Sequence, residues 1–190
     1  MRINLPTWLT LLRVLAIPVL VTVLCFGDRN PDWWAASIFA VAAITDWFDG
    51  YLARKLNQTS AFGAFLDPVA DKLMVGVALV MLVSADPRLV VALPAMVIIG
   101  REITISALRE WMAELGQRTH VAVSSHGKYK TGMQLTAIGL MLFKGNIHGF
   151  SLYRVGLACL WLAAVLTVWS MVIYLKAAWP TLKSGTKVKA

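Results

Sequence analysis

Cysteine and charge are scarce in this chain of 190 residues. Its two cysteines, Cys25 and Cys159, are too few for a disulfide framework, and both lie inside apolar runs, which indicates inert thiols. Charged residues make up 15% of the chain, against about 25% in soluble domains. Hydrophobic residues make up 58%, against roughly 45–50% in soluble domains. This composition excludes a disordered chain. It also excludes a soluble domain, because a core of this size cannot bury so many apolar side chains.

What the chain has instead is a series of long apolar runs. Polar or turn-rich breaks separate them and predict helices at residues 7–26, 33–52, 62–85, 89–115, 131–143 and 152–179, the fifth starting earlier, near residue 125. A membrane span needs about 20 apolar residues, so we predict an all-α integral membrane protein with six transmembrane helices. Because no repeat is visible, we expect residues 1–190 to form a single domain, with a basic C-terminal tail at 182–190. We predict no cleaved signal peptide, since no small-residue cleavage site follows the first run.

The basic residues indicate how these spans are oriented. The net charge is +8, which in a soluble protein would suggest nucleic acid binding. Of the 18 Lys and Arg residues, ten fall on the side of the two termini, four on the opposite side, and four within the spans. Because basic residues are enriched on the cytoplasmic side of membrane proteins, we predict that both termini are cytoplasmic.

Four of the 10 acidic residues lie inside apolar segments, at Asp46, Asp49, Asp67 and Asp71. Charged side chains are costly inside a bilayer and therefore indicate a functional site. Asp46 and Asp49 share a helix face, as do Gly63, Asp67 and Asp71, and we expect the two helices to be antiparallel neighbours whose acidic faces meet. Converging carboxylates need cations, and Mg²⁺ or Mn²⁺ prefers oxygen ligands. Two such ions commonly clamp phosphate oxygens.

The four aspartates are also compatible with two different roles. They could form buried ion pairs with the basic residues of the spans, Arg13, Lys72, Arg101 and Arg109. They could also carry ions or protons in a cation-coupled transporter, because intramembrane carboxylates serve that purpose as well.

The spacing of the aspartates resembles a family signature. Asp46-Trp-Phe-Asp49-Gly50-Tyr-Leu-Ala53-Arg54 is followed after eight residues by Gly63, then by Asp67 and Asp71. This run is similar to the signature of the CDP-alcohol phosphatidyltransferases, D-x2-D-G-x2-A-R-x8-G-x3-D-x3-D, at all eight specified positions. The resemblance extends over the whole chain, since the length, the expected spans and the position of the motif also fit.

The resemblance implies an enzyme that displaces CMP from CDP-diacylglycerol with an alcohol. It implies that Asp46, Asp49, Asp67 and Asp71 hold two divalent cations, Mg²⁺ or Mn²⁺, and that Asp71 is the general base. A carboxylate suits that role because the attacking alcohol must lose a proton. The positions expected to bind CDP-diacylglycerol are Asp49, Gly50, Ala53, Arg54, Ser60 and Gly63. Asn4 and Thr7 could lie in an interfacial helix over the nucleotide, or Thr7 could cap the first helix.

Within the family, residues 4–13, 101–116 and 127–131 resemble bacterial members that use sn-glycerol 3-phosphate as the acceptor. The acceptor phosphate needs cations, and the candidates are Arg101, Arg109, Lys128 and Lys130, with Thr131 adding a hydroxyl. Arg101 and Arg109 are eight residues apart and share a face in an unbroken helix; ion pairing with Glu102, Glu110 or Glu114 is the alternative. The resemblance also implies a homodimer in the bacterial inner membrane with its site facing the cytoplasm. A sister enzyme would use serine, inositol phosphate or a second phospholipid instead.

Overall fold

The computed structural model describes residues 5–27, 33–56, 61–114, 126–147 and 149–183, with the backbone alone at 5, 6, 47, 49–56, 61, 64, 126–130, 147 and 180–183. These residues form helices α1 (Leu5–Phe26), α2 (Trp33–Leu56), α3 (Ala61–Ala85), α4 (Leu89–Glu114), α5 (His126–Phe143) and α6 (Leu152–Lys183). The six predicted helical segments are confirmed, with ends displaced by at most a few residues. The predicted early start of the fifth is also correct.

A short strand pair, which the sequence analysis did not predict, links α5 to α6. Strand β1 (Asn146–Ile147) pairs antiparallel with β2 (Phe150–Ser151), so that Asn146 faces Ser151. The backbone reverses direction with Gly149 at a φ of 82°, a left-handed conformation that glycine adopts at little cost. With two residues in each strand, the alternation of polar and apolar residues that marks a strand is too short to recognise in a sequence.

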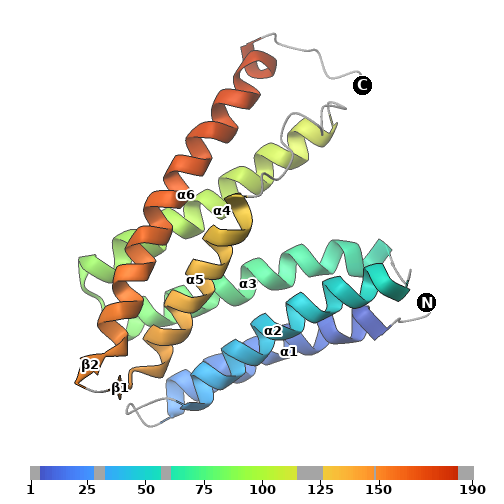
Figure 1. Ribbon diagram of the computed structural model, residues 1–190. Coiled ribbons are helices and arrows are strands. Elements are labelled where there is room, and N and C mark those ends of the chain that lie inside the picture. Colours follow the sequence, from blue (N-terminus) through green and yellow to red (C-terminus); the bar gives the residue numbers. More distant parts are fainter. Residues whose placement is uncertain (1–4, 28–32, 57–60, 115–125, 148, 184–190) are drawn as a thin grey trace.

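The helices form two arms that meet at one end of the molecule and diverge toward the other (Figure 1). In one arm, α1 packs against both α2 and α3; in the other, α4 packs against α6, and α5 lies against α6 and α2. Within the described residues, α2 and α3 contact each other much less than each contacts α1. The two helices predicted to be neighbours do contact each other, but most of their packing is against α1, which lies against both of them.

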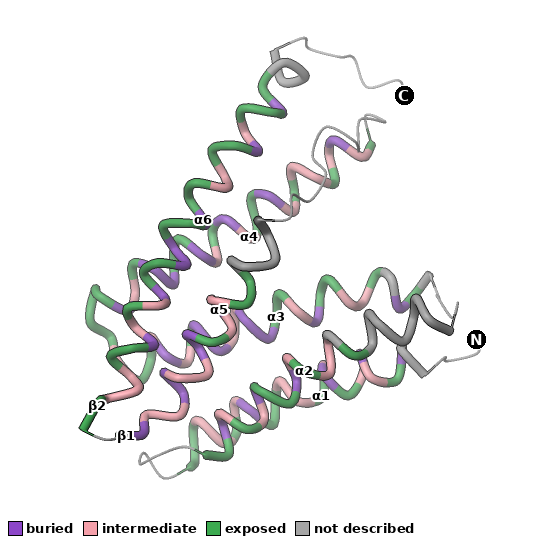
Figure 2. Tube along the Cα trace, viewed as in Figure 1, coloured by how far each residue is buried: buried purple, intermediate pink, exposed green. Residues whose placement is uncertain are grey.

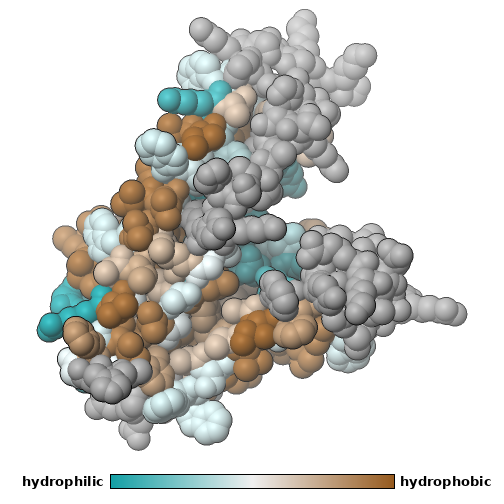
Figure 3. Space-filling view, viewed as in Figure 1, coloured by the Kyte–Doolittle hydropathy of each residue, from teal (hydrophilic) through white to brown (hydrophobic). Residues whose placement is uncertain are grey.

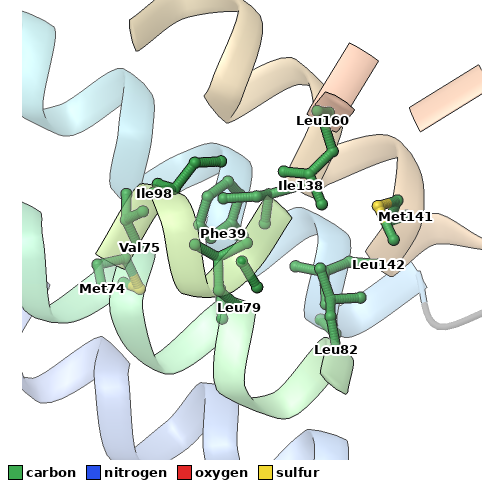
Figure 4. Close-up of a cluster of buried hydrophobic side chains, with 14 of the residues drawn as sticks. Phe39, Met74, Val75, Leu79, Leu82, Ile98, Ile138, Met141, Leu142 and Leu160 are labelled. Carbon is green, nitrogen blue, oxygen red and sulfur yellow. The ribbon is translucent and has the colours of Figure 1, made fainter. Parts of the chain in front are cut away.

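Apolar side chains from every helix form the core where the two arms meet. Phe39 of α2, Leu79 of α3 and Ile98 of α4 are at most 2% exposed and lie in one cluster with Leu20, Ile138 and Leu160. Figure 4 shows the labelled members of this cluster converging from neighbouring helices. Close packing of these side chains fixes the junction of the arms, because van der Waals contacts between helices replace the hydrophobic effect inside a membrane.

The outward faces of the helices are also apolar, and their side chains are exposed. Buried positions lie where helices face one another, and exposed positions lie on the outside (Figure 2). Exposed residues include Leu15, Val80, Ile103 and Val165. Among the described residues, four helical segments are long and apolar enough to cross a membrane: Thr7–Phe26, Phe65–Ala85, Leu89–Glu114 and Leu152–Trp179. The apolar parts of α2 and α5, Trp33–Asp46 and Thr131–Phe143, are shorter.

A polar contact closes the end at which the arms meet. Asp86, between α3 and α4, accepts hydrogen bonds from Arg88 Nε at 2.7 Å and Nη2 at 2.6 Å, and from the Tyr153 hydroxyl of α6 at 2.5 Å. Hydrogen bonds from Arg88, and then from Tyr153, hold the pKa of Asp86 well below its usual range. The link between α3 and α4 is therefore tied to the beginning of α6.

Close packing of α5 on α6 generates a prediction about two glycines. A Cβ at Gly156 would lie 2.8 Å from the Ala137 carbonyl oxygen, whereas one at Gly139 would have nothing within 4 Å. Gly156→Ala should therefore lower the free energy of unfolding by about 1–3 kcal/mol, because the two helices must separate. Gly139→Ala is the control and should raise it by up to about 1 kcal/mol, because alanine favours helix. Thermal unfolding in detergent measures both, and equal effects would contradict the packing.

Candidate functional site

Polar side chains of α1 hold the predicted aspartates of α2 and α3. Arg13 Nη1 donates to Asp46 Oδ1 of α2 at 2.5 Å, forming an ion pair. Thr10 Oγ1 donates to Asp67 Oδ1 of α3. Helix α1 is therefore the element that joins the two halves of the acidic motif.

Asp46 and Asp71 also face a common space. They line one small cavity together with Arg13, and the other walls include the apolar residues Phe39 and Met74. Arg13 is 3% exposed, whereas the side chain of Asp46 is 42% exposed. The prediction that carboxylates of the second and third helices converge is confirmed for Asp46 and Asp71. Helix α1 packs against both of these helices.

A polar stripe on α1 makes these contacts. Thr7, Thr10 and Arg13 are spaced by three residues and are 4%, 0% and 3% exposed, so they lie on one buried face of the helix. Because α1 begins at Leu5, Thr7 lies within the helix, and the alternative that it caps the helix is wrong. Thr10 was not predicted to belong to the site, although the regular spacing of Thr7, Thr10 and Arg13 inside an apolar run was an available signal.

The remaining positions of the predicted CDP-diacylglycerol site are only partly described. Gly63 is buried in α3. Asp49, Gly50, Ala53 and Arg54 lie on the last turns of α2, where the structure describes the backbone alone. Asn4 and Ser60 lie outside the described residues.

The chemistry of the aspartates suits a hard divalent cation. Asp46, Asp67 and Asp71 offer carboxylate oxygens, the ligand type that Mg²⁺ and Mn²⁺ prefer. Among the described side chains, which do not include that of Asp49, no group of three or more His, Cys, Asp and Glu residues is arranged to hold a metal ion. The carboxylate oxygens fit such a cation by their chemistry. One oxygen of Asp46 already binds Arg13, and one oxygen of Asp67 already binds Thr10, so a cation would compete with these contacts.

A second polar cluster lies between α4 and α6. Arg101 donates through Nη1 to Glu102 at 2.7 Å and through Nη2 to Ser170 Oγ at 3.3 Å. Arg109 Nη2 donates to the Tyr174 hydroxyl at 3.3 Å. The two arginines therefore share a face, as predicted, and Arg101 also forms the ion pair with Glu102 that was the alternative.

The other predicted acceptor residues lie on α5. Lys128 and Lys130 are on its first turns, where the structure describes the backbone alone, and Thr131 is exposed. The structure thus brings together Arg101 and Arg109 but describes no contact between them and the two lysines.

A groove with a volume of about 660 Å³ lies between α3 and α4. Lys72 and Glu102 line it, and its other walls are mostly apolar. Figure 3 shows hydrophilic atoms in the recess between the two arms and apolar atoms over the outer surfaces.

Comparison with known proteins identifies close relatives. A family model described as CDP-alcohol phosphatidyltransferase matches residues 3–169. The CDP-diacylglycerol–glycerol-3-phosphate 3-phosphatidyltransferase of Shigella flexneri serotype 5b (strain 8401) is 53% identical over 178 residues, which cover 94% of this chain and 96% of that protein. The protein of the same name from Escherichia coli (strain K12) is 52% identical with the same coverage.

A solved structure has the same fold. The crystal structure of Mycobacterium tuberculosis phosphatidylinositol phosphate synthase in apo form matches with a TM-score of 0.67 and 21% sequence identity, covering 92% of this chain and 88% of that chain. At this identity the match establishes the shared fold alone.

The contact between α1 and α3 generates a prediction for Thr10. Thr10→Val keeps the volume but removes the hydroxyl that donates to Asp67, and a hydrogen bond to a charged group contributes about 1.5–3 kcal/mol. We expect a loss of stability of this size in thermal unfolding. Thr22→Val is the matched control on the same helix, because the exposed Thr22 hydroxyl bonds only the Pro18 carbonyl of its own helix. If Thr10→Val were as harmless as Thr22→Val, α1 would not hold Asp67.

Proposed function

The chain belongs to the CDP-alcohol phosphatidyltransferase family, and we propose that it is a phosphatidylglycerophosphate synthase. It transfers the phosphatidyl group of CDP-diacylglycerol to sn-glycerol 3-phosphate, giving phosphatidylglycerophosphate and CMP. The observation that carries this proposal is the complete aspartate motif on α2 and α3, held by α1. The acceptor follows from the relatives that are 52–53% identical over 94% of the chain.

The chemistry is a displacement at phosphorus. The 1-hydroxyl oxygen of sn-glycerol 3-phosphate attacks the lipid-side phosphorus, the bond from that phosphorus to the CMP oxygen breaks, and the hydroxyl proton leaves to a base. Asp71 is the proposed base, because it lines the cavity beside Asp46 and a carboxylate can take that proton. Residues around the CDP-diacylglycerol are proposed to be Asn4, Thr7, Asp49, Gly50, Ala53, Arg54, Ser60 and Gly63.

Two divalent cations, Mg²⁺ or Mn²⁺, complete the proposed site. Asp46, Asp49, Asp67 and Asp71 would hold them. When bound, such ions neutralise the diphosphate and stabilise the departing CMP. Arg13 supplies a fixed positive charge beside Asp46, so part of the repulsion among the carboxylates is already compensated.

The acceptor phosphate is proposed to bind to basic residues of α4 and α5: Arg101, Arg109, Lys128 and Lys130, with Thr131. Guanidinium groups bind phosphate oxygens in pairs of hydrogen bonds. Arg101 pairs with Glu102, whereas Arg109 has no carboxylate partner among the described residues. The free charge of Arg109 supports the binding of the acceptor phosphate here.

We propose that all six helices enter the bacterial inner membrane as spans of one domain, residues 1–190, with both termini and the site on the cytoplasmic side. The basic tail, residues 182–190, fits a surface of anionic headgroups. The chain is proposed to act as a homodimer. CDP-diacylglycerol enters laterally from the lipid, and sn-glycerol 3-phosphate enters from water.

The test of the proposed function is CMP release by purified protein in detergent with CDP-diacylglycerol. We expect release that requires Mg²⁺ or Mn²⁺ and sn-glycerol 3-phosphate. Serine and inositol phosphate are assayed in parallel, and release with one of them instead would assign the chain to a sister enzyme. Folded protein that releases no CMP with any acceptor would contradict the whole proposal.

Asp71→Asn tests the proposed base. The substitution preserves volume and removes the proton acceptor, so we expect turnover to fall by about 10²–10⁴-fold while the protein stays folded. Asp86→Asn, at the opposite end of α3, is the control and should retain turnover per folded molecule. Near-normal turnover by Asp71→Asn would remove Asp71 from the mechanism.

Arg101→Ala and Lys128→Ala test the acceptor site. We expect each to raise the KM for sn-glycerol 3-phosphate by about tenfold with a smaller change for CDP-diacylglycerol, because only acceptor binding loses a cation. Arg154→Ala, exposed near the other end of the molecule, should change neither KM. Equal increases for both substrates would move these residues away from the acceptor.

A further inference from the structure

Two arginines of α4 share one aromatic partner on α6. The Cζ atoms of Arg101 and Arg109 lie 5.8 Å and 5.2 Å from the centroid of the Tyr174 ring. Eight residues of helix separate the arginines by about 12 Å along the axis. Each arginine therefore gains a cation–π contact with the same ring.

The cluster is buried and carries more positive than negative charge. Arg101 and Tyr174 are each 8% exposed, and Ile105 and Met112 beside them are 1% and 0% exposed. Glu102 pairs with Arg101, whereas no carboxylate in the described part of the chain pairs with Arg109. Arg109 itself is only partly buried, and its guanidinium group is suited to an added anion because no described carboxylate pairs with it.

Hydrogen-bond donors at this cluster also remain unused. Nε of Arg101 and Nε of Arg109 are buried and have no acceptor among the described residues. The Tyr174 hydroxyl oxygen accepts from Arg109, which leaves its own hydrogen for donation. Ser170 differs, because its hydroxyl donates to the Thr167 carbonyl at 2.9 Å and accepts from Arg101.

We propose that Tyr174 is a further binding residue of the acceptor site and a determinant of its specificity. Its ring sets the spacing of Arg101 and Arg109, and its hydroxyl donates to an oxygen of the phosphate monoester that the arginines bind. An uncharged alcohol brings no charge to compensate the cluster, so Tyr174 favours a phosphorylated acceptor. The inference rests on the proposed function, because it specifies the acceptor site of that reaction.

Two substitutions separate the ring from the hydroxyl. Tyr174→Phe keeps the ring and should raise the KM for sn-glycerol 3-phosphate by about tenfold, because a hydrogen bond to a charged group is lost. Tyr174→Leu also removes the ring and should raise this KM by a larger factor, with little change in the KM for CDP-diacylglycerol. Trp169→Leu is the matched control, because it removes an aromatic ring of α6 that is 71% exposed, and it should change neither KM.

A binding measurement gives a readout that does not depend on turnover. In the absence of CDP-diacylglycerol, sn-glycerol 3-phosphate and inorganic phosphate should raise the unfolding temperature of the wild type and the Trp169→Leu variant. The increase should be smaller for Tyr174→Phe and absent for Tyr174→Leu. Since Tyr174→Phe retains the packing, it decides the question if Tyr174→Leu does not fold.

The outcomes distinguish this inference from the proposed function. A wild type that releases CMP with sn-glycerol 3-phosphate, together with Tyr174 variants that raise both KM values equally or neither, would overturn the role of Tyr174 alone. A wild type that releases no CMP would overturn the proposed function. The phosphate-dependent change in unfolding temperature, and its loss in the Tyr174 variants, would then still support an anion site at this residue.

Discussion

The ion pair between Arg13 and Asp46 is the interaction on which the arrangement of the site depends. It brings a buried cation of α1 to the carboxylate of α2, while Thr10, one turn earlier, reaches Asp67 of α3. In an apolar bundle, a carboxylate without a partner is costly. The polar stripe of α1 thus gives two carboxylates of the acidic motif a partner, while apolar residues of α1 pack in the core with α2 and α3.

The second cluster applies the same principle with the opposite charge. Arg101 and Arg109 are supported by a carboxylate, a serine and the ring of Tyr174. One cluster thus has an excess of negative charge that suits cations, and the other an excess of positive charge that suits a phosphate. Joining a diphosphate donor to a phosphorylated alcohol requires one site of each kind.

Much of this could be predicted from the sequence, because the deciding signals were local. Six apolar runs bounded by turn residues gave the helices, and the spacing from Asp46 to Asp71 gave the acidic motif and the family. The pairing of helices was not predictable in the same way. The helices α2 and α3 were expected to be neighbours and do contact each other, but the larger contact that each of them makes with α1 was not expected.

Two residues that were not predicted from the sequence, Thr10 and Tyr174, matter because they contact charged residues that are distant in the chain. Thr10 is 57 residues from Asp67, and Tyr174 is 65 residues from Arg109. An isolated threonine or tyrosine in an apolar helix is most simply explained by packing, and only the tertiary structure shows that a charge lies opposite it. Charged residues were easier to assign, because a charge in an apolar segment is energetically costly and indicates a function even before its partner is known. Neutral polar residues such as Thr10 and Tyr174 carry little cost of their own, so their roles become visible only when the charges they support have been placed.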